Sequence, residues 1–123
     1  MNQEETSKTN GMTNHLEIGK SKALIIVEII EYVPNSVVSK TIIKKSTGTV
    51  SVIAIEKGEG LTEKTSPFDT FTQIIEGKAE IVIDRKSHFL NTGQSIIIPA
   101  HTSNIVKANE RFKMILTVIK SEE

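Results

Sequence analysis

The chain has 123 residues, with 15 Lys and Arg against 15 Asp and Glu, and it contains no cysteine. This length holds one domain with a hydrophobic core and is too short for two. The balanced charge gives no field that would attract nucleic acid, and the missing cysteines exclude disulfides, thiolate metal sites and cysteine nucleophiles.

The beginning of the chain is polar. Residues 1–14 show no periodicity and hold too little apolar surface to offset their ordering entropy, so we expect a flexible tail there and a single domain over residues 15–123. The start lacks the apolar core of a signal peptide, and no apolar run is as long as a membrane span. We therefore expect a cytoplasmic protein that makes no membrane contact.

The first strongly apolar run is Ala23–Val33, which ends at Pro34 and Asn35. Its periodicity does not distinguish a strand from a short helix, and we expect an extended segment that includes a helical turn. From Ser36 onward, short apolar and β-branched runs alternate with turn residues such as Gly48 and Gly77. The predicted strands are 36–45, 49–58, 71–76, 79–84, 89–90, 94–98 and 111–120. Many short strands with little helix predict an all-β sandwich or barrel.

Several of these strands are apolar on both faces. The clearest examples are SIIIP at 95–99 and FKMILTVI at 112–119. One face of such a strand lines the interior, while the other packs on another element or subunit. We therefore expect a homodimer formed through the N-terminal strands.

The segments GEGLTEK, PFD, EGKAEI and IIIPA occur in this order between residues 58 and 100. Together they resemble the two-part signature of small single-domain bacterial cupins of the cupin 2 conserved-barrel type. The resemblance spans about Ser36 to Ile119 and implies a double-stranded β-helix, or jelly-roll, barrel that is commonly a dimer. It also implies four metal-ligand positions, which fall at Lys64, Ser66, Thr70 and Asn104.

None of these four residues is the histidine or glutamate that such a metal site uses, so the resemblance carries the fold and not a metal-dependent reaction. We expect no metal and no cofactor. The remaining histidines, His15, His88 and His101, stand apart in the sequence. Only His101 is placed to join Asp69 or Glu63 in an atypical metal site.

The residues at these positions favour a binding site for a small molecule. The Lys64 ammonium would stand at the mouth of the barrel and attract an anion such as a carboxylate. Small polar side chains around the same rim would orient the ligand by hydrogen bonds. The predicted binding residues are Lys64, Ser66, Thr70, Gln73 and Asn104. In the alternative interpretation, Lys64 pairs with a neighbouring carboxylate and the others satisfy local backbone groups.

These observations predict a metal-free cupin-fold protein that binds a small molecule in its barrel. The alternative function is an enzyme, either a lysine-dependent isomerase or lyase acting through Lys64, or a metal-dependent oxygenase with an atypical ligand set. A third hypothesis is a barrel that serves only for dimerisation or for contact with a partner protein.

Overall fold

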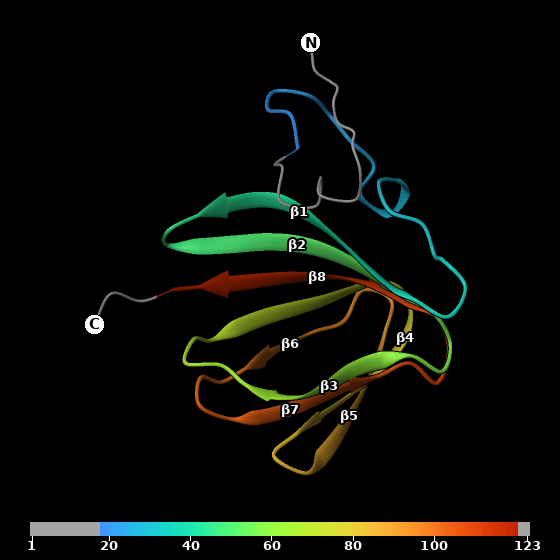
Figure 1. Cartoon of the computed structure of the whole chain (residues 1–123), viewed down its shortest axis with the longest axis vertical. Helices are drawn as coiled ribbons and strands as arrows, with labels where there is room; N and C mark the ends of the chain where they lie inside the picture. Colours follow the sequence, from blue (N-terminus) through green and yellow to red (C-terminus); the bar gives the residue numbers. More distant parts are fainter. Residues whose placement is uncertain (1–17, 121–123) are drawn as a thin grey trace.

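The computed structural model describes residues 18–120, so the tail expected over residues 1–14 lies outside the described residues. In the described part, eight β-strands form one curled antiparallel sheet (Figure 1). The elements are η2 (Ile26–Glu28, a 3-10 turn), β1 (Val37–Lys45), β2 (Gly48–Ile55), β3 (Gly60–Thr65), β4 (Thr70–Ile83), β5 (Lys86–Asn91), β6 (Ser95–Ile98), β7 (Ser103–Lys107) and β8 (Phe112–Ile119). The predicted all-β barrel is confirmed, and η2 lies within the apolar run that was expected to include a helical turn.

The sheet curls into two facing layers that share strand β4. In the larger layer the order is β1-β2-β8-β4, and β6 pairs with the first half of β4. In the smaller layer, β5 and β7 pair with the second half of β4, and β3 pairs with β7. Figure 1 shows β1, β2 and β8 above β3, β7 and β5. The two layers enclose the main core.

Strand β4 connects the two layers and differs from the prediction. We expect two strands separated by a turn at Gly77, but Thr70–Ile83 is one 14-residue strand. A register shift against β8 between Ile74 and Glu76 bends it. Gly77 has a φ of 88°, and a Cβ there would collide with a backbone carbonyl of the adjacent segment. This glycine therefore allows a bend inside a strand, and the two strands expected on either side of it are one.

The sequence pattern does not predict β3 or β7. Both strands contain many polar residues, and most of β3 is exposed, so their hydrophobic alternation is weak. The two strands pair with each other, with Lys64 opposite Asn104. They complete the smaller layer and bring two predicted site residues together.

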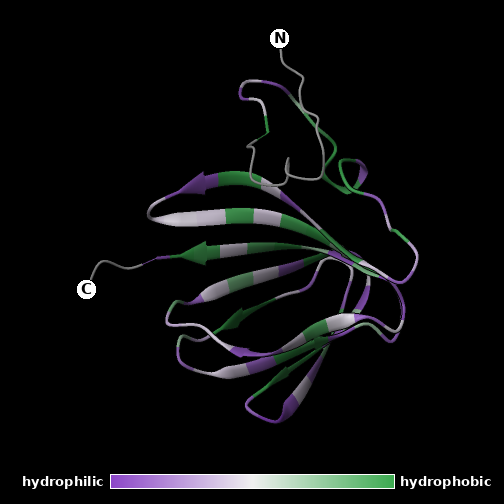
Figure 2. Cartoon of the chain, in the orientation of Figure 1, coloured by the Kyte–Doolittle hydropathy of each residue, from purple (hydrophilic) through white to green (hydrophobic). Residues whose placement is uncertain are grey.

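Apolar side chains form two clusters, one on each face of the larger layer. Inside the barrel, the main cluster includes the fully buried Phe112 and Met114. On the outer face, Ile30 of the N-terminal segment packs with Val52 and Ala54 of β2. Green apolar bands alternate with pale bands of intermediate hydropathy along β2 in Figure 2. The N-terminal segment of the same chain thus covers part of the outer face, and the expected homodimer stays a prediction.

Polar side chains fasten the N-terminal segment to this outer face. The Tyr32 hydroxyl donates to Glu76 Oε2 at 2.7 Å, and Lys113 Nζ donates to the Val27 carbonyl at 2.6 Å. The cationic groups of Arg111 and Lys113 lie 4.3 Å and 5.0 Å from the centre of the Tyr32 ring. Burial and the Glu76 carboxylate raise the pKa of Tyr32 above its usual range. We call Tyr32, Glu76, Arg111 and Lys113 the outer clasp.

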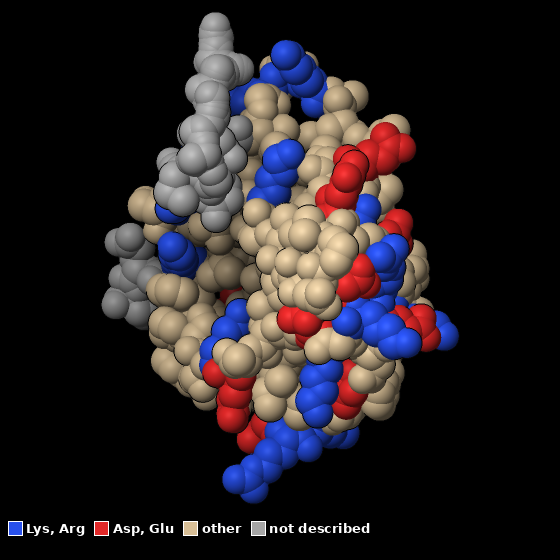
Figure 3. Space-filling view, turned by 45° about the vertical axis from the view of Figure 1, so that its right-hand side comes forward, with Lys and Arg blue, Asp and Glu red and all other residues tan. Residues whose placement is uncertain are grey.

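The surface carries charges of both signs. Basic and acidic side chains intermix on the face shown in Figure 3. Beside the outer clasp, Arg111 donates two hydrogen bonds to the Glu56 carboxylate, at 2.6 Å and 3.1 Å. These bonds hold the pKa of Glu56 down at about 2. Among the described residues, no helix has the length and apolar character needed to cross a membrane.

Candidate functional site

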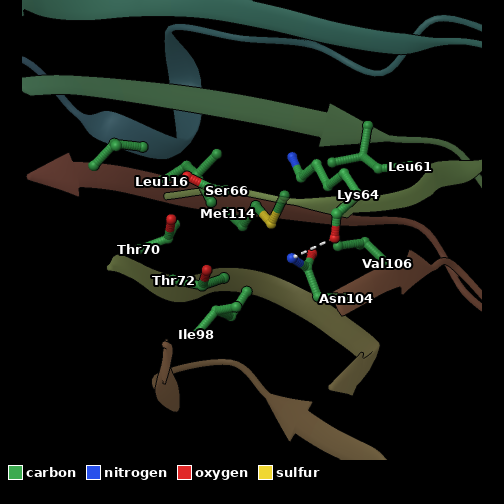
Figure 4. A pocket seen from close by; sticks show the side chains of 11 residues that line it. Leu61, Lys64, Ser66, Thr70, Thr72, Ile98, Asn104, Val106, Met114 and Leu116 are labelled. Atoms are coloured by element: carbon green, nitrogen blue, oxygen red, sulfur yellow. Dashed lines mark hydrogen bonds between the residues drawn. The ribbon is translucent and has the colours of Figure 1, made fainter. Parts of the chain in front are cut away.

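A pocket of about 120 Å³ lies between the two layers (Figure 4). Its walls come from five strands and the loop after β3, so no single segment of the sequence contains it. Apolar side chains supply most of the lining, and four of the polar side chains are predicted site residues. The lining residues are Leu61, Lys64, Ser66, Thr70, Thr72, Ile98, Asn104, Val106, Met114, Leu116 and Val118.

The sheet register explains why these residues meet. Residues directly opposite each other in an antiparallel pair point to the same face. Thr70 lies opposite both Ile98 and Val118, and Thr72 lies opposite Leu116. Alternate residues of β4, β7 and β8 therefore face the pocket, whereas Leu61 and Lys64 of β3 are three residues apart across a register shift.

Four of the five predicted binding residues line this pocket, namely Lys64, Ser66, Thr70 and Asn104. Gln73 does not line it. Because Gln73 is three residues from Thr70, it points to the opposite face of β4, where it lies opposite Ile115. The prediction missed Thr72, although its separation of two residues from Thr70 places both side chains on the same face.

Two polar side chains that line the pocket, Thr72 from the larger layer and Asn104 from the smaller one, have an unusual environment. Thr72 is fully buried and Asn104 is 4% exposed. Neither Thr72 Oγ1 nor Asn104 Oδ1 has a hydrogen-bond partner among the described residues. Asn104 Nδ2 donates to the Lys64 carbonyl at 3.4 Å, a long hydrogen bond. A buried polar atom without a partner costs about 1–3 kcal/mol, so these two atoms are unfavourable for folding alone.

The rim of the pocket is held by local hydrogen bonds. Ser66 Oγ accepts a hydrogen bond from the Phe68 amide at 3.1 Å, which leaves the Ser66 hydroxyl hydrogen free to donate. The Ser66 carbonyl accepts from the His101 amide at 2.6 Å. Asp69 Oδ1 accepts from the Ala100 amide at 2.8 Å. These bonds tie the loop after β3 to the loop before β7, so both edges of the rim are fixed.

The donor groups at the four ligand positions do not fit a metal ion. A protonated lysine has no lone pair, and neutral hydroxyls and an amide are weak ligands for the transition metals that imidazole and carboxylate bind. Within residues 18–120, histidine, aspartate and glutamate nowhere gather in a group of three. His101 is exposed, and the Glu63 carboxylate accepts from the Ser103 hydroxyl. These positions therefore give no basis for a metal-dependent reaction. The third histidine, His15, lies outside the described residues.

Solved structures similar to this chain share its architecture. A conserved protein of unknown function from Streptococcus pyogenes is 29% identical at a TM-score of 0.82, with 93% of this chain and 100% of that chain covered. A cupin superfamily protein from Desulfitobacterium hafniense is 24% identical at a TM-score of 0.80, covering 85% of this chain and 96% of its own. A cupin 2 conserved barrel domain protein from Leptotrichia buccalis is 29% identical at a TM-score of 0.74, covering 76% of this chain and 46% of its own.

The curled two-layered sheet and the pocket between its layers define a small all-β jelly-roll protein with a concave site. Together with these neighbours, they show that the chain has the cupin fold, as the sequence resemblance predicted. No protein-family model and no curated protein matches the chain. The similarity therefore shows the fold of the chain and does not show its function. The chemistry of the protein has to be inferred from the residues of the pocket.

Proposed function

We propose that this protein binds a small molecule in the pocket between its layers. The observation that carries the proposal is a cavity of about 120 Å³ with apolar walls, into which polar groups from β3, β4 and β7 converge. Protein interiors are normally close-packed, so a cavity of this size inside a small barrel is a feature to be explained. Apolar walls with a few placed polar groups are the usual composition of a ligand site.

Lys64 gives this site its charge preference. Its side chain is exposed at the entrance of the pocket, and it forms no ion pair with any described residue. The neighbouring carboxylates are engaged elsewhere, since Glu63 accepts from Ser103 and Asp69 accepts from the Ala100 amide. The ammonium group is therefore available to a ligand, and it favours an anion such as a carboxylate.

A binding role agrees with these contacts better than the enzyme alternatives do. Within the described residues, no hydrogen bond or ion pair joins the Lys64 amine to a carboxylate or histidine that would serve as its proton acceptor. General acid–base catalysis needs such a partner within hydrogen-bond reach. The polar groups that converge on the pocket are suited to holding a molecule in one orientation.

A thermal-shift screen of small carboxylates, sugars and amines would test this proposal. A ligand present at 100 times its Kd adds about 2.7 kcal/mol to the stability, which raises Tm by several degrees. Val118→Phe would fill part of the pocket and abolish the shift. Val33→Phe is the matched control, because Val33 is 45% exposed and does not line the pocket. A shift of the same size in both folded variants would place binding elsewhere and refute the proposal.

A further inference from the structure

One residue that lines the pocket carries a hydrogen-bond acceptor without a partner. Asn104 Nδ2 donates to the Lys64 carbonyl (Figure 4), and Asn104 Oδ1 has no partner among the described residues. The opposite amide orientation would bring two carbonyl oxygens together, which is unfavourable. Thr72 Oγ1 belongs to the facing layer, lines the same pocket and also lacks a partner. An amide oxygen and a hydroxyl without partners are suited to a ligand group that donates a hydrogen bond, such as a hydroxyl or an amine.

The entrance presents the opposite chemistry. There the Lys64 ammonium, the free hydroxyl hydrogen of Ser66 and the Thr70 hydroxyl can all donate. Charged and neutral donors on one rim are suited to a carboxylate, which accepts through both oxygens. The pocket therefore offers donors on Lys64, Ser66 and Thr70 and an acceptor without a partner on Asn104.

The rest of the lining is mostly hydrocarbon. The side chains of Leu61, Met114, Leu116 and Val118 supply apolar lining of the same pocket. We propose that the ligand is a short aliphatic hydroxy- or amino-carboxylate, with its carboxylate at Lys64 and its hydroxyl or amine at Asn104 and Thr72. This inference rests on the proposed function of the pocket and adds the class and orientation of the ligand.

Binding requires a small movement of the Thr72 and Asn104 side chains. Less than 1 Å² of Thr72 Oγ1 and of Asn104 Oδ1 is exposed, so a ligand reaches them only when the side chains turn. The hydrogen bond that holds the Asn104 amide is 3.4 Å long and is therefore weak. Turning this amide toward the ligand exchanges a weak hydrogen bond for a better one, and the side-chain NH₂ resonance of Asn104 would report the change.

Three matched probes test the inference, namely 3-hydroxybutyrate, butyrate and butane-1,3-diol, titrated into the full chain and followed by amide NMR shifts. The first has both polar groups, the second only the carboxylate and the third only the hydroxyls. We expect 3-hydroxybutyrate to bind about five- to tenfold more tightly than either partial analogue, as one extra satisfied hydrogen bond implies. Its binding should shift the side-chain resonance of Asn104.

Variants then assign each preference to a residue. Thr72→Val should remove the advantage of 3-hydroxybutyrate over butyrate, while Thr72→Ser, which keeps the hydroxyl, should retain it. Lys64→Met should remove the advantage of 3-hydroxybutyrate over the diol. Lys57→Met is the matched control, because Lys57 is an exposed lysine that does not line the pocket.

Equal affinity for butyrate and 3-hydroxybutyrate would overturn the inference and leave the proposed function intact. The same holds if the preference for the hydroxyl survives in Thr72→Val. If none of the three probes shifts a pocket resonance, the ligand class is also wrong. The wider screen with Val118→Phe then decides separately whether the pocket binds any small molecule.

Discussion

The two faces of the larger layer treat their polar groups in opposite ways. On the outer face, the Tyr32 hydroxyl and the Lys113 amine each have a hydrogen-bond partner at 2.7 Å or less. On the inner face, Thr72 Oγ1 is buried without one, and so is Asn104 Oδ1 on the facing smaller layer. Thr72 and Lys113 belong to adjacent paired strands, so the same sheet carries both arrangements.

This difference separates a structural role from a binding role. Polar groups that satisfy one another, as in the outer clasp, stabilise the attachment of the N-terminal segment. Buried polar groups that lack partners reduce stability, and they are retained in a protein when another molecule can satisfy them. Changes in the outer clasp should therefore alter folding and leave ligand binding intact, and changes in the pocket should do the reverse.

The largest expected effect is that of Lys113→Met in the outer clasp. Lys113 is 8% exposed, and its loss leaves the Val27 carbonyl without its charged donor. We expect the free energy of unfolding to fall by about 2 kcal/mol, measured by urea denaturation. The affinity for 3-hydroxybutyrate should stay within a factor of two. A loss of affinity in the folded variant would contradict the separation of the two faces.

Thr72→Val should act in the opposite direction. Valine has a similar shape and removes a buried hydroxyl that has no partner among the described residues. We expect the free energy of unfolding to rise by about 1 kcal/mol while the hydroxyl preference of the pocket is lost. Thr62→Val is the matched control and should change neither property, because Thr62 is exposed and does not line the pocket. A clear destabilisation by Thr72→Val would show that the hydroxyl has a structural role.

Tyr32→Phe tests the outer clasp by its effect on how stability depends on pH. Burial, followed by the Glu76 carboxylate, raises the pKa of Tyr32, so the folded protein keeps this phenol neutral where the unfolded chain begins to ionise, above about pH 10. The stabilising contribution is full below that pH and is lost as the pH rises toward the pKa of the folded state. We expect Tyr32→Phe to destabilise the protein by about 1 kcal/mol at pH 7. It should also remove part of the alkaline loss of stability, as measured by Tm between pH 8 and pH 12.

The smallest effect is expected for Glu56→Gln at the edge of the outer clasp. The Arg111 guanidinium lowers the pKa of Glu56 from 4.5 to about 2. The contribution of this carboxylate to stability is therefore present above pH 4.5 and is lost as the pH falls toward 2. Tm of the variant should lie slightly below that of the wild type at pH 7, and the two values should converge at pH 2. A gap that stays constant over this range would exclude the ion pair as its cause.

Much of the fold could be predicted from local pattern. Short apolar and β-branched runs predicted β1, β2 and β8, and the EGKAEI and IIIPA segments resembled cupins. The polar strands β3 and β7 were missed because their pairing, and not their apolar alternation, makes them strands. The continuity of β4 through Gly77 was also missed, since a glycine between two apolar runs predicts a turn and a bend equally well.

The sequence alone determined the cupin barrel and the absence of the expected metal-ligand residue types at Lys64, Ser66, Thr70 and Asn104, because both follow from residue identity and spacing along the chain. Only the tertiary structure decided which polar groups have partners. Tyr32 and Glu76 are 44 residues apart, and Lys113 and Val27 are 86 apart. The alternation of side chains across a strand turned Thr72 into the pocket and Gln73 away from it. Hydrogen-bond satisfaction depends on neighbours in space, and for that reason the pocket became visible only in the folded chain.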